Sequence, residues 1–356
     1  MNALFKNTAH SLRLAAALTG TVVGAGFLSG TELVRFFPEC GYLSCVALSA
    51  LLFAGCFWLL FLCGKKYGGY KGVLRALFSG AAPVFSALML ASSFIMCAAM
   101  LAGLSATGEE GFSLPAPLFP LAACALLFFA GRGCKGLFAV NLLLVPFILA
   151  FIFSLAGEPW TAGVAGETGG GALRLVNVLA YVCMNCFLAA PLVCDAGAEG
   201  SGGAGCAFAA ALTGVCAAVL LAKISSNAAA QQAQMPVLSL LSGGARTLFS
   251  LVCTAGILTT LFSSWYPLDA QCAKGRHAVL WRAALPAGAF LLSLMGLKHI
   301  VRFVYPLVGG AGAIFLAVCA VRSRLLFDQP LFGKGYQRIH ARGKHAQDHR
   351  RRHHQI

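Results

Sequence analysis

Hydrophobic stretches that are almost free of charge recur along nearly the whole chain. Only 10% of the residues are charged, against roughly a quarter in soluble proteins. A membrane-spanning helix needs about 20 mostly apolar residues. Ten stretches meet this length, at about 14–36, 42–63, 80–104, 113–131, 136–156, 172–194, 203–222, 247–267, 278–297 and 303–321. We therefore predict an all-α, polytopic membrane protein with ten transmembrane helices.

The positions of lysine and arginine predict the orientation. With ten spans and a cytoplasmic N-terminus, most of the 26 Lys and Arg residues fall on the cytoplasmic side, as the positive-inside rule requires. We expect a multi-pass protein of the cell membrane with both termini in the cytoplasm. Residues 326–356 form a basic, His-rich tail, for which we predict a disordered cytoplasmic extension beside anionic lipid.

The first hydrophobic segment is unusually rich in glycine. Residues 19–31 read TGTVVGAGFLSGT and contain Gly20, Gly24, Gly26 and Gly30. Glycine weakens a helix, and unwound backbone at membrane depth is tolerated only around a binding cavity, as in the discontinuous helices of secondary transporters. The alternative is a surface of small residues for helix packing.

The chain divides into two halves of five spans, at about 8–157 and 172–325 within a single domain of residues 1–325. In transporters with inverted repeats, broken helices occupy corresponding positions in the two halves, so the sixth segment is compared with the first. There Tyr181 and Asn185 share one helical face and Pro191 removes a backbone donor. A buried Asn beside a Tyr is equally compatible with simple helix–helix contact.

The eighth segment supplies hydroxyl oxygens at Thr259 and Thr260, after Gly256. A dehydrated sodium ion needs about five or six oxygen ligands, by the logic that governs other hard cations. Two hydroxyls are too few, so carbonyls of an unwound segment must contribute. The alternative is that each hydroxyl bonds only to its own helix.

The stretch from Gly20 to Glu32, followed by Phe36 and Phe37, resembles the opening span of the YkvI-like membrane protein family. That family is part of the amino acid–polyamine–organocation transporter superfamily. The span count and the features of segments six and eight are similar as well. The resemblance implies a LeuT-type fold, a 5+5 inverted repeat with broken helices 1 and 6 and the substrate between them.

The same resemblance implies a set of site residues. The substrate-binding residues would be Val23, Gly24, Ala25, Gly26, Tyr181 and Asn185, with the amides of a half-helix facing an anionic group. Sodium would be bound by Gly20, Val23, Gly256, Thr259 and Thr260; Thr260 with Ser263 and Ser264 is a shifted alternative nearer the cytoplasmic end of span eight. Proton-coupled relatives place a Lys on the fifth span, whereas residues 136–156 contain none, which favours sodium as the coupling ion.

Glu32 is a carboxylate within the first span, and an ionisable residue at such depth is a candidate for function. It is predicted to act as a gate or a proton relay. Arg35 lies three residues further on, so plain pairing of the two at the outer surface is the alternative.

The leading functional hypothesis is a secondary transporter that moves a small polar organic solute, an amino acid or related amine, with sodium by alternating access. The alternatives are a proton-coupled transporter and a nutrient-sensing receptor subunit without turnover. The spans contain no histidine and no nucleophile–base pair, so no enzyme is predicted. The expected partners are a small-molecule substrate and the lipid bilayer, with no nucleic acid, no cofactor beyond sodium, and no prediction of oligomeric state.

Overall fold

The computed structural model describes residues 2–37, 42–130, 137–155, 171–200, 202–272 and 277–327, and the regular structure within these ranges is helical. The predicted tail lies outside them from residue 328 on. The α-helices are α1 (Asn2–Val22), α2 (Ala25–Ser29), α3 (Thr31–Phe36), α4 (Tyr42–Tyr67), α5 (Tyr70–Val73), α6 (Ala82–Ala106), α7 (Leu118–Ala130), α8 (Leu137–Leu155), α9 (Gly171–Glu199), α10 (Ala204–Ser225), α11 (Ala228–Gln232), α12 (Pro236–Ser239), α13 (Gly243–Cys272), α14 (Ala278–Ser293), α15 (Leu297–His299) and α16 (Tyr305–Phe327). Short π-helical or 3-10 turns connect several of them, namely η1 (Leu74–Phe78), η2 (Ser79–Ala81), η3 (Thr107–Gly111) and η5 (Ile300–Val304).

Six helical segments of the described chain are long and apolar enough to cross a membrane: Leu43–Tyr67, Tyr70–Gly111, Leu173–Glu199, Ala204–Ser225, Gly243–Asp269 and Leu297–Ser323. Three shorter apolar helices fall within α7, α8 and α14, and the remaining predicted stretch is the interrupted run α1 to α3. The prediction of an all-α, multi-pass membrane protein is confirmed. The count of ten crossings and the 5+5 repeat stay predictions.

The interruption of the first segment is confirmed. Helix α1 ends at Val22 and α2 begins at Ala25, with Gly24 in an extended conformation (φ −88°, ψ −166°). A second break follows at Gly30, whose φ of +83° is left-handed. A side chain there would also strike Ile224 of α10, because its Cβ would lie 2.4 Å from the Ile224 Cδ1. Glycine at this position therefore satisfies both the backbone and the packing.

The predicted break in the sixth segment is wrong. Helix α9 is continuous from Gly171 to Glu199 and passes through Pro191. Proline costs one intrahelical hydrogen bond and does not by itself end a helix that its neighbours hold. The middle of α9 also lacks glycine, so its residues have the ordinary preference for helical φ and ψ. The interrupted first segment therefore packs, through α1, against the continuous helix α9.

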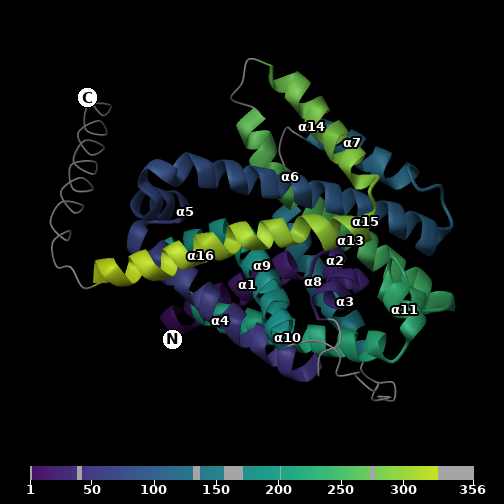
Figure 1. The fold of residues 1–356 in the computed structure, drawn as a ribbon, viewed down its shortest axis with the longest axis horizontal. Coiled ribbons are helices and arrows are strands. Elements are labelled where there is room, and N and C mark those ends of the chain that lie inside the picture. Colours follow the sequence, from purple (N-terminus) through teal and green to yellow (C-terminus); the bar gives the residue numbers. More distant parts are fainter. Residues whose placement is uncertain are drawn as a thin grey trace.

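Helix α9 lies near the centre of the molecule (Figure 1), and its most extensive contacts are with α4 and α16. Glycines bring these helices into backbone contact. A Cβ on Gly64 of α4 would lie 2.0 Å from the Cys194 carbonyl oxygen, and one on Gly312 of α16 would lie 2.2 Å from that of Cys183. Further packing joins α10 to α4 and α1, and α13 to α6 and α8, while α7 and α14 lie side by side at one edge.

Candidate functional site

The backbone at the first interruption leaves two carbonyls out of the helical hydrogen-bond ladder. The Val23 N–H still donates to the Thr19 oxygen, at 2.7 Å, but the Gly24 N–H turns to the Val22 oxygen, at 2.9 Å, instead of that of Gly20. The ladder resumes with the Leu28 N–H donating to the Gly24 oxygen at 2.9 Å. The carbonyls of Gly20 and Val23 therefore fall between the two described ladders, where they can act as ligands.

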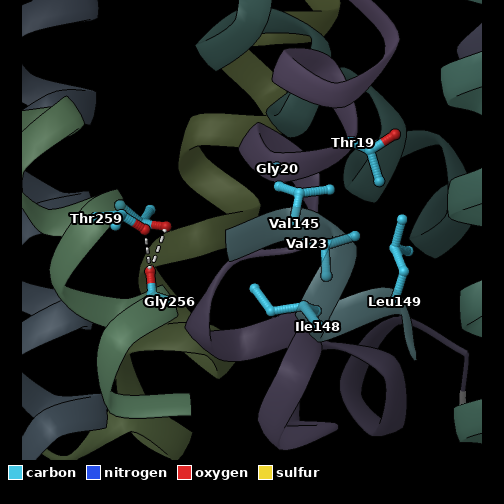
Figure 2. Close-up of a pocket in the computed structure, with 9 residues that line it drawn as sticks. Thr19, Gly20, Val23, Val145, Ile148, Leu149, Gly256 and Thr259 are labelled. Atoms are coloured by element: carbon cyan, nitrogen blue, oxygen red, sulfur yellow. Dashed lines mark hydrogen bonds between the residues drawn. The ribbon is translucent and has the colours of Figure 1, made fainter. Parts of the chain in front are cut away.

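These two residues line a pocket with the hydroxyl-bearing part of α13. Its lining residues come from α1, α8 and α13 and from Val23: Thr19, Gly20, Val23, Val145, Ile148, Leu149, Gly256, Thr259 and Thr260. Figure 2 shows these side chains around the pocket. All five residues predicted to bind sodium lie on its wall. The space is a narrow crevice without room for a water molecule.

The oxygens of α13 in this pocket form a small cluster. The hydroxyls of Thr259 and Thr260 both donate to the Gly256 carbonyl, at 2.9 and 3.0 Å, as the dashed lines in Figure 2 show. The alternative that each threonine hydroxyl bonds within its own helix is therefore observed. Both hydroxyl oxygens lie next to the Gly256 carbonyl, and their lone pairs can still bind a cation. Thr260 also lies beside Gly24, since a Cβ on that glycine would be 3.6 Å from the Thr260 methyl.

A second cluster surrounds Glu32. Its side chain is buried, with 4% exposed, and it lies directly on Gly26, because a Cβ there would be 2.1 Å from the Oε1 atom. The other carboxylate oxygen, Oε2, has no hydrogen-bond partner within the described residues. The same carboxylate interacts electrostatically with the phenols of Tyr181 on α9 and Tyr305 on α16.

The pairing of Glu32 with Arg35 is not found. The Arg35 guanidinium lies over the Phe36 ring, 5.7 Å from its centroid, and its Nε has no hydrogen-bond partner in the described part of the chain. Both residues lie on α3, which follows the left-handed turn at Gly30, but the Glu32 side chain is buried against Gly26 whereas the Arg35 guanidinium packs on the Phe36 ring. The Thr31 hydroxyl fixes this turn by donating to the Gln234 carbonyl at 2.7 Å.

The ring of Tyr181 packs against three other aromatic rings. Its ring centroid is 5.4 Å from those of Phe36 and Phe37 and 5.9 Å from that of Phe53. The hydroxyl is buried and has no hydrogen-bond partner among the described residues. Tyr305, which is not among the residues predicted from the sequence, contributes a second buried hydroxyl, 3.4 Å from the Met96 sulfur. A tyrosine hydroxyl inside a span is the signal that would have pointed to it, since such groups usually need a polar partner.

The remaining predicted substrate residues are placed differently. Asn185 is buried, and its side-chain NH₂ donates to the Tyr181 carbonyl at 3.0 Å within α9. It therefore bonds within its own helix. Ala25 and Gly26 are the first residues of the short helix α2 rather than part of the unwound stretch. Only Val23 and Gly24 are non-helical at this break, so the unwound stretch is shorter than predicted.

Comparison with known proteins agrees with this architecture. The chain is 24% identical over 332 residues to the uncharacterised membrane protein YkvI of Bacillus subtilis, a match that spans 85% of this chain and 93% of YkvI. No family model matches the chain. The chain is a homologue of YkvI. That relation agrees with the resemblance of the opening span.

Solved structures supply the fold. A point mutant of the manganese transporter of Eremococcus coleocola superposes with a TM-score of 0.58, at 15% identity, over 86% of this chain and 77% of that one. Mhp1 in its inward-facing conformation superposes with a TM-score of 0.55, at 10% identity, over 87% and 75%. Both have the LeuT-type fold, and the chain superposes on that fold over most of its length, while the 5+5 repeat itself stays a prediction. YkvI is named as a membrane protein and the Eremococcus coleocola protein as a manganese transporter, so neither name contradicts the expectation that the chain is not an enzyme.

Proposed function

We propose that this protein is a secondary transporter that moves a small polar organic solute, an amino acid or related amine, with sodium by alternating access. The observation that carries the proposal is the meeting of the interrupted first helix with the hydroxyls of α13 in one pocket. Interrupted helices near the bilayer centre are the feature on which secondary transporters build their binding sites. The LeuT-type fold supports this reading.

Sodium fits the donors of the pocket. The carbonyls of Gly20 and Val23 lack an intrahelical partner in the described ladder, and Gly256, Thr259 and Thr260 of α13 line the same crevice. Neutral carbonyl and hydroxyl oxygens are the ligands that a hard cation prefers. Helix α8, the predicted fifth span, presents Val145, Ile148 and Leu149 to the pocket, so no lysine of this helix supplies a positive charge in place of the ion.

The cargo would bind beside this pocket, between the interruption and α9. The end of α1, the start of α2 and the buried phenol of Tyr181 provide backbone amides, aromatic surface and a hydroxyl. Such a mixture of apolar walls with few polar groups is typical of sites for small organic molecules. The 5+5 repeat of the LeuT-type transporters would allow this site to open to each side of the membrane in turn.

Sodium-driven uptake tests the proposal. A thermal-stability screen of the purified protein against amino acids and amines, with and without sodium, would first identify a compound that binds. Uptake of that compound into proteoliposomes should then depend on an inward sodium gradient. In Thr259→Ala and Thr260→Ala we expect the sodium concentration for half-maximal uptake to rise about tenfold or more, because a contact to a charged group contributes roughly 1.5–3 kcal/mol.

Ser263→Ala is the matched control. Its hydroxyl also bonds within α13, to the Thr259 carbonyl at 2.8 Å, but the residue does not line the pocket. Uptake that does not depend on sodium and is unchanged in both threonine variants would contradict the proposal that sodium is the coupling ion. Uptake that follows a pH gradient would replace sodium by the proton, and tight binding without any flux would favour a receptor.

A further inference from the structure

The buried carboxylate of Glu32 lies among elements that bring it no compensating positive charge. Helix α3 packs against α2, α9, α10 and η5, whose described basic residues are Arg174, Lys223 and Arg302, besides Arg35 on α3 itself. None of these four contributes a charge that stabilises the ionised Glu32 in the described part of the chain. In the described part of the chain, the phenols of Tyr181 and Tyr305 couple electrostatically to the carboxylate, and Tyr181 packs against Phe36, which lies on α3 together with the acid.

A carboxylate at this depth cannot carry an uncompensated charge. Transferring an ionised carboxylate to a low-dielectric interior costs far more than a fold can supply, so the group binds a proton or a cation. The phenols do not solve the problem, because the Tyr181 hydroxyl is itself without a described partner and that of Tyr305 contacts the Met96 sulfur. Since the structure describes no counter-charge for this buried carboxylate, we expect it to hold a proton in this arrangement.

The surroundings of Glu32 fit an ammonium group better than a carboxylate of the cargo. Aromatic rings attract cations, and the rings of Phe36, Phe37 and Tyr181 pack together at the C-terminal end of the helix that carries the acid. The Arg35 guanidinium already lies over the Phe36 ring. A second carboxylate at the start of α2 would lie against Glu32 on Gly26 and be repelled when both are ionised. This revises the expectation that the half-helix amides bind the anionic end of the cargo.

We propose that Glu32 exchanges a proton for the ammonium group of the cargo, so that a cationic amine is the group this site selects. In the closed state the acid holds the proton. When α2 and α3 open the site, the ammonium group pairs with the carboxylate and one proton leaves to solvent, which keeps the charge of the site constant. This inference rests on the proposed transport function, because it assumes that the bound amine is transported. Its test requires only that the amine binds.

Infrared difference spectroscopy of the purified protein tests this exchange. At pH 7 exposed carboxyl groups are ionised, because the ordinary pKa of Glu is about 4.3, so an acid C=O band reports a buried protonated carboxyl. We expect this band in the wild type, its loss on adding propylamine, and no response to propanol or potassium propionate, which share the carbon skeleton. The loss should release about one proton per amine bound, measured with an indicator dye in weak buffer.

Variants assign the band to Glu32. Glu32→Gln is isosteric with the protonated acid and should lack both the band and the proton release, whereas Glu109→Gln, at an exposed carboxyl, should keep both. If Glu32→Gln does not fold, Glu32→Asp should shift the band. Absence of the band from the wild type, or its persistence with propylamine, would overturn the proposal, as would a response to manganese chloride alone. Failure of sodium-driven uptake would leave these spectra unchanged, so the two proposals fail separately.

Discussion

Gly26 and Glu32 act as a pair at the scale of single residues. The carboxylate occupies the volume in which any side chain at position 26 would begin, with Oε1 at 2.1 Å and both Cγ and Cδ at 2.6 Å from that point. Glycine is needed here for space rather than for its backbone conformation, since Gly26 is helical. The position of the acid thus depends on an absent methyl group earlier in the same segment.

Gly26→Ala should push the Glu32 side chain from its place and lower stability by about 1–3 kcal/mol, the usual cost of an overpacked interior. Glu32→Ala in the same background removes the collision. We therefore expect the two substitutions to be strongly non-additive when apparent melting temperatures are compared in a double-mutant cycle. Additive effects would show that the two groups do not touch.

That Gly256, Thr259 and Thr260 line one pocket with the first segment could be predicted from the sequence, whereas the surroundings of Glu32 could not, and sodium itself stays a prediction. Gly256, Thr259 and Thr260 lie on one face of one helix, so their spacing alone brings their oxygens together. The inward position of Glu32 depends instead on the left-handed turn at Gly30, and the contribution of Tyr305 depends on the packing of a helix at the other end of the chain. Long-range packing of this kind leaves no local pattern.

At the scale of elements, α9 is held by close backbone contact with two helices, α4 and α16. Gly64 of α4 and Gly312 of α16 lie against carbonyls of α9, and small residues at such interfaces let helices in a membrane pack without a hydrophobic driving force. This support explains why Pro191 does not break α9. The sequence predicted the break of α1 correctly because its glycines cluster, and it overestimated the effect of one proline in a well-packed helix.

The two glycines Gly312 and Gly310 of α16 make this contact testable. Gly312→Ala places a methyl 2.2 Å from the Cys183 carbonyl oxygen, whereas a Cβ on Gly310 would have nothing within 4 Å. We expect Gly312→Ala to destabilise by about 1–3 kcal/mol and Gly310→Ala to be neutral or slightly stabilising, since Ala is the better helix former. Thermal unfolding in detergent measures both, and equal effects would argue against the contact.

At the scale of the whole molecule, the exposed apolar surface and the positions of the basic residues both fit a protein that spans a membrane. Large apolar side chains such as Phe129 and Leu307, each more than 70% exposed, point away from the core, where acyl chains would cover them. Basic residues stand at helix ends, such as Lys65 and Lys66 in the last turn of α4. The positive-inside rule assigns this end of α4 to the cytoplasm.

Reporter fusions test the predicted orientation. A fluorescent protein that matures only in the cytoplasm should be bright when fused after Ile356. Alkaline phosphatase, active only after export, should be active when fused after Gly169, which follows the predicted fifth span. The reverse pattern would invert the topology, and placement of both positions on one side would contradict an odd number of spans between them.

The continuous helix α9 packs beside the interrupted α1. In the proposed function, this arrangement would separate substrate recognition from ion binding. Tyr181 and Asn185 stand on a frame fixed by α4 and α16, whereas the crevice between α1, α8 and α13 takes nothing from α9. If the proposed function holds, substitutions on α9 should therefore alter which molecule is recognised without disturbing the proposed sodium ligands. Divergence among homologues of this chain should accordingly change cargo more readily than coupling.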